Sequence, residues 1–259
     1  MDQAATFAKA IAERHRKCER FTLEAPAGRE GDLDFAYATQ AALLPRIAGG
    51  SPRIAGWKVG LTTPRMQQMC GIDQPIAGVV LADRVHASGH VVRLAEFGRI
   101  GIEFEIAMRL GRDLGPGDAP FDRAKVAAAV DAVAPAFELI DDRQADYKTL
   151  DVLSLVADNS WNEGVVLGAF RSTWPELGAI VGTVTCDGAE IDRGRGSDVL
   201  GHPLAPLEWL AGHLAQSGGA LRAGDIVMTG SLVTTRFPEP GQRYGFALDG
   251  LGAVELSAV

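Results

Sequence analysis

Two glutamates spaced two residues apart are the most informative chemical feature of the chain. Glu103 and Glu105 lie in the segment 101–108, whose alternation of apolar and acidic residues is typical of a β-strand. Because side chains two apart on a strand point to the same side, the two carboxylates share one face. A solvated strand face explains this pattern without any function. A divalent cation bound between the carboxylates would, however, cancel the repulsion between their charges.

A third glutamate favours the metal-binding interpretation. Glu138 lies in the apolar segment 135–140, where an unpaired charge would be costly. Arg143 is an available partner for it. Alternatively, three converging glutamates would suit a hard cation such as Mg²⁺ or Mn²⁺. Three carboxylates leave half of an octahedral shell free, which is enough for a bidentate ligand and one water.

Lys58 and Asp83 are candidate acid–base groups. Lys58 lies between two glycines in the run 56–62, so its ammonium either reaches solvent or is partly desolvated. Desolvation would lower its pKa and make it a plausible proton carrier. Asp83 is a single acid that closes the apolar run 80–83, where a turn residue is the alternative interpretation.

Short strands are the main elements expected to position these residues. Short apolar runs bounded by Gly, Pro and Asp are typical of strands. They predict strands at 56–61, 78–81, 101–110, 136–140, 164–168, 180–186, 225–229 and 243–248.

Helical spacing of apolar residues predicts four helices, which begin near Ala4, Asp34, Asp122 and Pro206. Pro45 is expected to end the second helix. The third follows the stripe Val126, Val130 and Val133, with Pro135 just beyond its end.

The order of these elements predicts the fold class. Strands do not alternate regularly with helices, which disfavours a doubly wound parallel sheet. We therefore expect an α+β protein with a helical N-terminal region, 1–53, and a β-rich catalytic domain, 54–259.

Composition excludes several other classes of protein. The 259 residues include 33 acidic and 25 basic ones, and a net charge of −8 disfavours binding to nucleic acid. Three cysteines without a CxxC pair indicate reduced thiols. No run approaches the ~18 apolar residues of a membrane span, and the start lacks the apolar core of a signal peptide. A cytoplasmic location without membrane association is therefore expected.

Common catalytic signatures are missing from the sequence. It contains no GxxxxGK[ST] or GxGxxG loop, no GxSxG elbow and no HExxH, and its five histidines are scattered. His15 and Glu19 are four apart in a charged segment and are expected to be solvated.

An ordered set of segments carries a family resemblance. They are GWKVGLTTPRMQQ (56–68), GIDQP (71–75), IEFEIAM (102–108), PAFELI (135–140), VADN (156–159), GRGSDVLGHPLAPLEWLA (194–211) and AGDIVMTGS (223–231). Through them the chain resembles the hydratase/decarboxylase branch of the fumarylacetoacetate hydrolase superfamily, most of all its 2-keto-4-pentenoate hydratases. The pair Asp141-Asp142 departs from the family pattern.

The resemblance implies a mixed β-sandwich roll that holds one divalent metal ion, Mg²⁺ or Mn²⁺. It implies these site residues: Glu103, Glu105 and Glu138 as metal ligands, Lys58 with Asp83 as the proton-transfer pair, and Val59, Leu61, Ser160 and Ser231 near the substrate. The patch 160–162 after VADN would influence substrate preference.

The resemblance also implies an activity in the catabolism of aromatic compounds. A 2-hydroxy-2,4-dienoate, or its 2-oxo-enoate tautomer, would gain water at C4 and become a 4-hydroxy-2-oxo acid. The alternatives are a 4-oxalocrotonate-type decarboxylase, a C–C bond hydrolase, for which no convincing His/Glu pair is present, and a catalytically silent metal-binding protein. A homo-oligomer of two or more copies is expected, and association with a neighbouring pathway enzyme is an open alternative.

Overall fold

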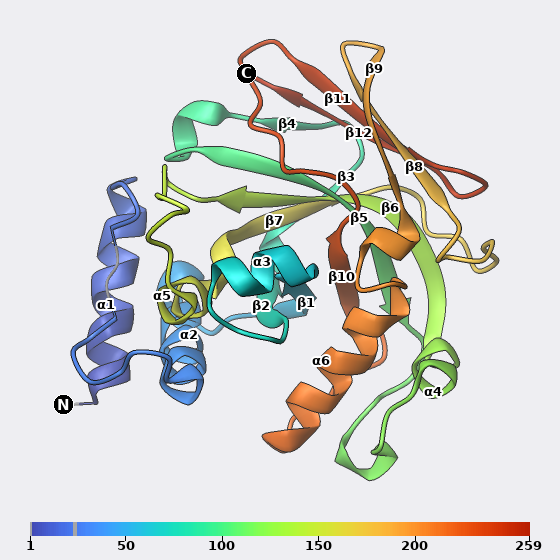
Figure 1. Ribbon diagram of the computed structural model, residues 1–259. Helices are drawn as coiled ribbons and strands as arrows, with labels where there is room; N and C mark the ends of the chain where they lie inside the picture. The colour runs from blue at the N-terminus through green and yellow to red at the C-terminus, as the bar shows by residue number, and fades with distance from the viewer. Residues whose placement is uncertain (1, 23–24) are drawn as a thin grey trace.

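Two β-sheets form the centre of the computed structural model, which describes residues 2–22 and 25–259 (Figure 1). The larger sheet has the strand order β2-β1-β10-β5-β6-β7-β3, and the smaller one has the order β4-β12-β11-β8-β9. The strands of the larger sheet are β1 (Ile54–Gly60), β2 (Ile76–Leu81), β3 (Val85–Ala87), β5 (Ile100–Leu110), β6 (Val130–Asp141), β7 (Asn162–Leu167) and β10 (Ile226–Ser231). Those of the smaller sheet are β4 (His90–Val92), β8 (Val181–Cys186), β9 (Ala189–Arg195), β11 (Arg243–Leu248) and β12 (Gly252–Ala258).

The helices lie around the larger sheet, away from the smaller one (Figure 1). They are α1 (Gln3–Arg16), α2 (Leu33–Ile47), α3 (Pro64–Met69), α4 (Arg123–Ala127), α5 (Val152–Ala157) and α6 (Leu204–Gln216). Mixed sheets with a helical N-terminal part confirm the predicted α+β class. Within the described residues, no helix is long and apolar enough to cross a membrane.

The hydrophobic core between the two sheets orients the central strands. Phe104 on β5 and Phe137 on β6 are paired in the antiparallel register and are fully buried. Their rings pack edge to face at 5.5 Å between centroids, and Phe246 of β11 lies 5.7 Å from Phe104. Because side chains alternate along a strand, the residues next to these phenylalanines point to the opposite face of the larger sheet.

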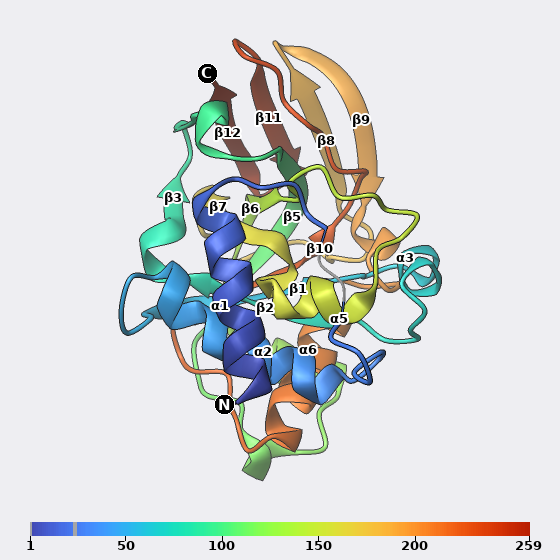
Figure 2. The same cartoon turned by 90° about the vertical axis from the view of Figure 1, so that its left-hand side faces the viewer.

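The N-terminal helices cover one side of the larger sheet. Figure 2 shows α1 and α2 beside α5, in front of β1 and β2. Ile11 and Leu43 from these helices belong to the same buried cluster as Ile76, Val156 and Trp161. The predicted division into 1–53 and 54–259 stays a prediction; β1 begins at Ile54, next to that boundary.

The helix predicted from Asp122 to Pro135 is wrong in its second half. Asp122 does cap α4 by accepting from the Lys125 backbone N–H at 2.8 Å, but α4 ends at Ala127. β6 then begins at Val130 and is buried on both faces. Such a strand is apolar at nearly every position, so its valines also match the spacing of an apolar helix face. Pro135 is tolerated inside β6 because it faces the end of β7, where its carbonyl accepts from the Gly168 N–H.

Some of the other elements were predicted too short, and some were not predicted. α2 continues past Pro45 to Ile47. The short strands β3 and β4, the hairpin strand β9 and the C-terminal strand β12 were not predicted. Neither were the short helices α3 and α5, because six residues are too few for a clear helical period.

Candidate active site

Three glutamates meet on the face of β5 and β6 opposite the phenylalanine core. Glu103 of β5 is the direct partner of Glu138 on β6, and Glu105 lies two residues farther along β5. One carboxylate oxygen from each lies within 4.8 Å of the others. Glu105 and Glu138 are completely buried, and Glu103 is partly buried. In the part of the chain that the structure describes, this is the one group of three or more side chains that could hold a metal ion.

Neighbouring hydrogen bonds fix these carboxylates and leave two oxygens free. The Thr235 hydroxyl donates to Glu103 at 2.8 Å, the Gly230 N–H to Glu105 at 2.7 Å, and the Asn162 amide to Glu138 at 2.9 Å. The other buried oxygens, Glu105 Oε1 and Glu138 Oε2, have no hydrogen-bond partner. Buried oxygens of this kind are costly unless a cation satisfies them. The residues therefore fit a divalent cation.

Lys58 completes the charge balance of the glutamate centre. Its Nζ lies 3.2 Å from Glu138 Oε1, and only 4% of the residue is exposed. The Lys58 side chain passes over Gly78 to reach the carboxylate. A Cβ on Gly78 would lie only 3.0 Å from Lys58 Cγ and Cδ. The residue that neutralises Glu138 is thus Lys58, and the predicted alternative, Arg143, is wrong. Three carboxylates and one ammonium leave two negative charges, which match a divalent cation.

The structure corrects the expected direction of the Lys58 pKa. Burial of the ammonium lowers this pKa, but the negative charges of the three glutamates raise it more, so it lies above its ordinary value. Lys58 is therefore protonated when the carboxylates carry their charges. Burial alone would lower the Lys58 pKa, as predicted from the sequence.

The pKa values of the buried glutamates predict pH-dependent metal binding. Burial and the neighbouring carboxylates raise the pKa of Glu105 well above its usual range. Burial also raises the pKa of Glu138, although Lys58 opposes this. Because a cation binds the ionised form, protons are released on binding, and affinity increases as pH rises through the range in which these carboxyl groups ionise. Calorimetric Mg²⁺ titrations in two buffers of different ionisation enthalpy measure the released protons; identical heats in both buffers would contradict this expectation.

A left-handed turn carries Asn162 to the centre. Asn159, Ser160 and Trp161 have φ angles of 51°, 49° and 62° in succession, a conformation that costs free energy for residues other than glycine. The Asn159 amide holds the turn against β2 by accepting from the Val79 N–H at 2.8 Å and donating to the Val79 carbonyl at 2.9 Å. The turn thus directs the side chain of Asn162 at Glu138.

The remaining predicted site residues occupy different surroundings. Ser160 lies in this turn and donates to the Ala77 carbonyl at 3.4 Å. Ser231 accepts from the Phe104 N–H and donates to the Val233 carbonyl. Val59 packs in the core between the sheets, and Leu61 is buried with φ at 55°. Their roles near the substrate stay predictions.

Asp83 is not brought to Lys58 by this structure. It is exposed in the 3₁₀ turn η1 (Ala82–Arg84), where its charge acts on His86. The acidic groups that act on the Lys58 ammonium are the three glutamates. Its role as the partner of Lys58 therefore has no geometric support, and the turn interpretation describes its position.

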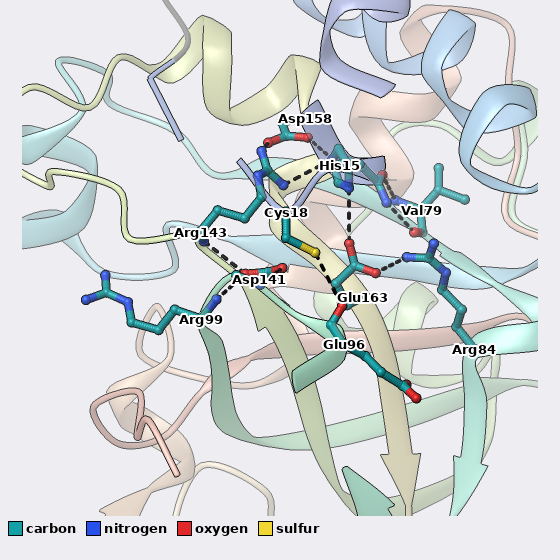
Figure 3. A network of polar contacts seen from close by, with 12 residues as sticks. His15, Cys18, Val79, Arg84, Glu96, Arg99, Asp141, Arg143, Asp158 and Glu163 are labelled. Carbon is teal, nitrogen blue, oxygen red and sulfur yellow. Dashed lines mark hydrogen bonds and ion pairs between the residues drawn. The ribbon is translucent and has the colours of Figure 1, made fainter. Parts of the chain in front are cut away.

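His15 belongs to a largely buried charge network with Asp158 and Arg143, and its predicted solvation is wrong. Figure 3 shows His15 and Arg143 converging on Asp158. His15 Nε2 lies 2.5 Å from Asp158 Oδ1, Arg143 pairs with the other oxygen, and His15 Nδ1 lies 3.4 Å from Glu163. Because Asp158 directly precedes the left-handed turn, the network fastens α1 to the segment that carries Asn162.

The His15 network predicts a loss of stability at alkaline pH. Burial lowers the pKa of His15, but the charge and hydrogen bond of Asp158, helped by Glu163, raise it from 6.5 to about 9. This corresponds to stabilisation on the order of 3 kcal/mol, fully present below pH 6.5 and lost as pH rises through about 9. Denaturant unfolding should show the wild type more stable than His15→Gln at pH 6, with the gap closing by pH 10. Glu19→Gln, an exposed change nearby, is the control; a pH-independent gap would contradict the assignment.

Three polar groups of the centre were not identified as ligand partners from the sequence. Asn162 lay in the patch assigned to substrate preference, whereas Thr235 and the Gly230 N–H carried no signal. Gly230 has φ at 105°, and a Cβ there would meet Thr62 Oγ1 at 2.2 Å. A pocket of about 660 Å³ between α6 and the loop around Phe121 is lined by none of these residues.

Comparison with known proteins agrees with this geometry. Residues 65–258 match the fumarylacetoacetate (FAA) hydrolase C-terminal family. The chain is 34% identical over 231 residues to a 2-keto-4-pentenoate hydratase of Burkholderia vietnamiensis, covering 88% of this chain and 86% of that one. It is 32% identical to a 2-hydroxyhexa-2,4-dienoate hydratase of Comamonas testosteroni, covering 88% and 86%.

A solved structure is similar over the whole chain. It is the 4-oxalocrotonate decarboxylase from Pseudomonas putida G7 in complex with calcium and acetate, with a TM-score of 0.87, 27% identity, and coverage of 100% of this chain and 98% of that one. The same enzyme in complex with magnesium and adipate gives a TM-score of 0.85 at 26% identity, with the same coverage. The family match over most of the sequence, together with these relatives, shows that the chain belongs to the fumarylacetoacetate hydrolase C-terminal family.

Proposed function

We propose that the protein is a metal-dependent hydratase that adds water to a 2-hydroxy-2,4-dienoate and releases a 4-hydroxy-2-oxo acid, in the catabolism of aromatic compounds. Glu103, Glu105 and Glu138 would hold the cation, Mg²⁺ or Mn²⁺. The observation that carries the proposal is the pair of buried, unpartnered oxygens on Glu105 and Glu138 beside the Lys58 ammonium. The two hydratases at 34% and 32% identity support this reaction.

The reaction divides into a proton shift and an addition. In the shift, the C2 hydroxyl loses its proton and C5 gains one, which converts the dienol into a 2-oxo-3-enoate. In the addition, the oxygen of water bonds to C4 and a proton reaches C3. The bound cation supplies Lewis-acid stabilisation of negative charge at the substrate's C2 oxygen.

Lys58 is the residue proposed to move protons. Its Nζ lies against the Glu138 carboxylate within a desolvated site. A cation held by the three glutamates would offset the negative charges that raise the Lys58 pKa, and the ammonium would then be able to give up and regain a proton. Asn162, Thr235 and the Gly230 N–H hold the glutamates in place during these steps.

Decarboxylation of 4-oxalocrotonate is the second candidate activity, because the similar solved structure is of that enzyme. It would use the same carboxylates and the same stabilised charge. The two reactions differ in whether the far end of the substrate carries a second carboxylate.

A paired ultraviolet assay distinguishes the two activities. Purified protein with Mg²⁺ or Mn²⁺ is mixed with 2-hydroxypenta-2,4-dienoate in one cuvette and 4-oxalocrotonate in another, each repeated with chelator. Metal-dependent loss of the dienoate alone is the expected result. Loss of the oxalocrotonate with release of CO₂ would favour the decarboxylase, and silence in both cuvettes with metal bound would contradict both activities.

A homo-oligomer of two or more copies is also proposed, on the basis of the family resemblance. Light scattering coupled to size-exclusion chromatography measures the mass against the 27.4 kDa of one chain.

A further inference from the structure

We propose that Asp142 sets the substrate preference of this site. Because Asp142 forms an ion pair with the Arg99 guanidinium, the site favours a 2-oxo acid whose end opposite the 2-oxo group is uncharged over a dicarboxylate. The inference rests on the proposed function, because it concerns which substrate the glutamate centre accepts.

Arg99 and Asp142 extend the row of residues that carries the metal ligands. Glu103 pairs with Glu138 across β5 and β6, and Gly101 pairs with Ile140 two residues farther along the same face. Arg99 and Asp142 are the next members of this row. Four residues of extended chain separate Arg99 from Glu103, about 13 Å between Cα atoms.

A continuous line of contacts joins Glu103 to Arg99. Thr235, whose hydroxyl binds Glu103, has its methyl 2.9 Å from where a Cβ on Gly101 would lie, and the Phe237 ring lies 3.1 Å from the same point. The Arg99 guanidinium lies over the Phe237 ring, 4.5 Å from its centroid. The guanidinium of Arg99 thus lies on a ring that itself contacts Gly101. Gly101 is needed here because these neighbouring side chains fill the space that its Cβ would occupy.

The exposure of side chains in and beside this row indicates where a substrate would extend. Glu105 and Glu138 are fully buried, whereas Glu103 and Thr235 are partly exposed and Phe237 is 39% exposed. The exposed side of the centre is therefore that of Glu103, Thr235 and Phe237, and the Phe237 ring contacts Arg99. An exposed aromatic ring on this side suits the hydrocarbon chain of a substrate whose carboxyl end is held at the glutamates.

The charge at the far end of this strip is already balanced. Asp142 is fully buried, and its two oxygens accept from Arg99 Nε at 2.7 Å and from the terminal nitrogen of the same fork. Tyr147 also donates its hydroxyl to Asp142 at 3.0 Å. A bidentate arginine–carboxylate pair of this kind is strong and neutral. A second substrate carboxylate would therefore meet a paired cation and a negative charge beside it.

Two saturated 2-oxo acids of equal length test the inference by binding alone. Calorimetry on the Mg²⁺-loaded protein would compare 2-oxohexanoate with 2-oxoadipate, which differ in the terminal carboxylate. We expect the wild type to bind 2-oxohexanoate about tenfold more tightly. Asp142→Asn keeps the shape of the side chain and removes its charge, and should shift the ratio toward 2-oxoadipate by about ten- to a hundredfold.

Two further variants identify the cause of this shift. Asp131→Asn breaks a similar bidentate pair with Arg109 elsewhere on β5 and β6, and should leave the ratio unchanged. Adding Arg99→Gln to Asp142→Asn should abolish the gain.

Three outcomes would overturn the inference. The first is an unchanged ratio in an Asp142→Asn protein that binds Mg²⁺ normally. The second is a wild-type protein that binds 2-oxoadipate more tightly than 2-oxohexanoate, together with an Arg99→Gln variant that lacks this preference. This test does not require the Asp142→Asn variant to fold. The third is a metal-loaded wild type that binds neither acid, which would contradict the proposed function as well. Failure to hydrate the dienoate, with the expected binding ratio intact, would count against the proposed function alone.

Discussion

Replacing Glu105 by Gln is expected to weaken Mg²⁺ or Mn²⁺ binding at least about a hundredfold and to abolish hydratase activity. Glu105 is completely buried, and its Oε1 has no partner in the protein. Gln keeps the oxygen that accepts from the Gly230 N–H, so the fold around the site is preserved. Titration calorimetry with each cation measures the affinity, and the dienoate assay measures the activity.

The same substitution should stabilise the metal-free protein. Because the Glu105 pKa is raised in the folded state, the folded form loses stability as pH rises above the ordinary glutamate pKa near 4.5. Gln removes this penalty, and a gain of ~1 kcal/mol would raise Tm by about 2–4 °C at neutral pH. Glu239→Gln, an exposed change, is the control. If Glu105→Gln retained wild-type metal affinity, or lowered Tm without metal, Glu105 would not be a ligand in a strained acidic cluster.

Replacing Lys58 by Met is expected to lower kcat by about a thousandfold while metal is still bound. Met fills a similar volume but cannot carry a proton. The Lys58 ammonium competes with a cation for Glu138, from which it lies 3.2 Å away. Its removal should therefore leave metal affinity equal to or higher than that of the wild type.

This opposite effect on binding and turnover separates Lys58 from the metal ligands. Lys9→Met on the exposed side of α1 is the matched control and should change neither quantity. An unchanged rate in Lys58→Met would exclude the lysine from proton transfer. A large loss of metal affinity would show that its charge organises the carboxylates.

The cluster of three glutamates was predictable in part because it depends on local alternation. Side chains two residues apart on a strand lie on the same face of any sheet, so Glu103 and Glu105 must point to the same side. Glu138 was conspicuous because a charge in an apolar strand needs compensation. The family resemblance joined the two segments, and the register of β5 with β6 then places Glu103 opposite Glu138.

Long-range partners were not predictable in the same way. His15 was expected in solvent because its neighbours in the sequence are charged, yet α1 packs so that His15 meets Asp158, 143 residues away. Lys58 was correctly identified as a buried-lysine candidate, but the direction of its pKa depends on three carboxylates that its own segment does not contain. The strand at Val130 was mistaken for a helix because a strand buried on both faces has no distinct period.

The sequence by itself therefore determined the α+β class and the family to which the chain belongs, and it singled out the three glutamates and Lys58, which the fold brings together. These follow from side-chain alternation, apolar patterning and ordered motifs, all of which act over short stretches of chain. Only the tertiary structure decided which charges are paired: Lys58 with Glu138, Arg143 with Asp158, and Arg99 with Asp142. Pairing depends on packing between distant segments, since the strength of an ionic contact is set by distance and burial rather than by position in the sequence.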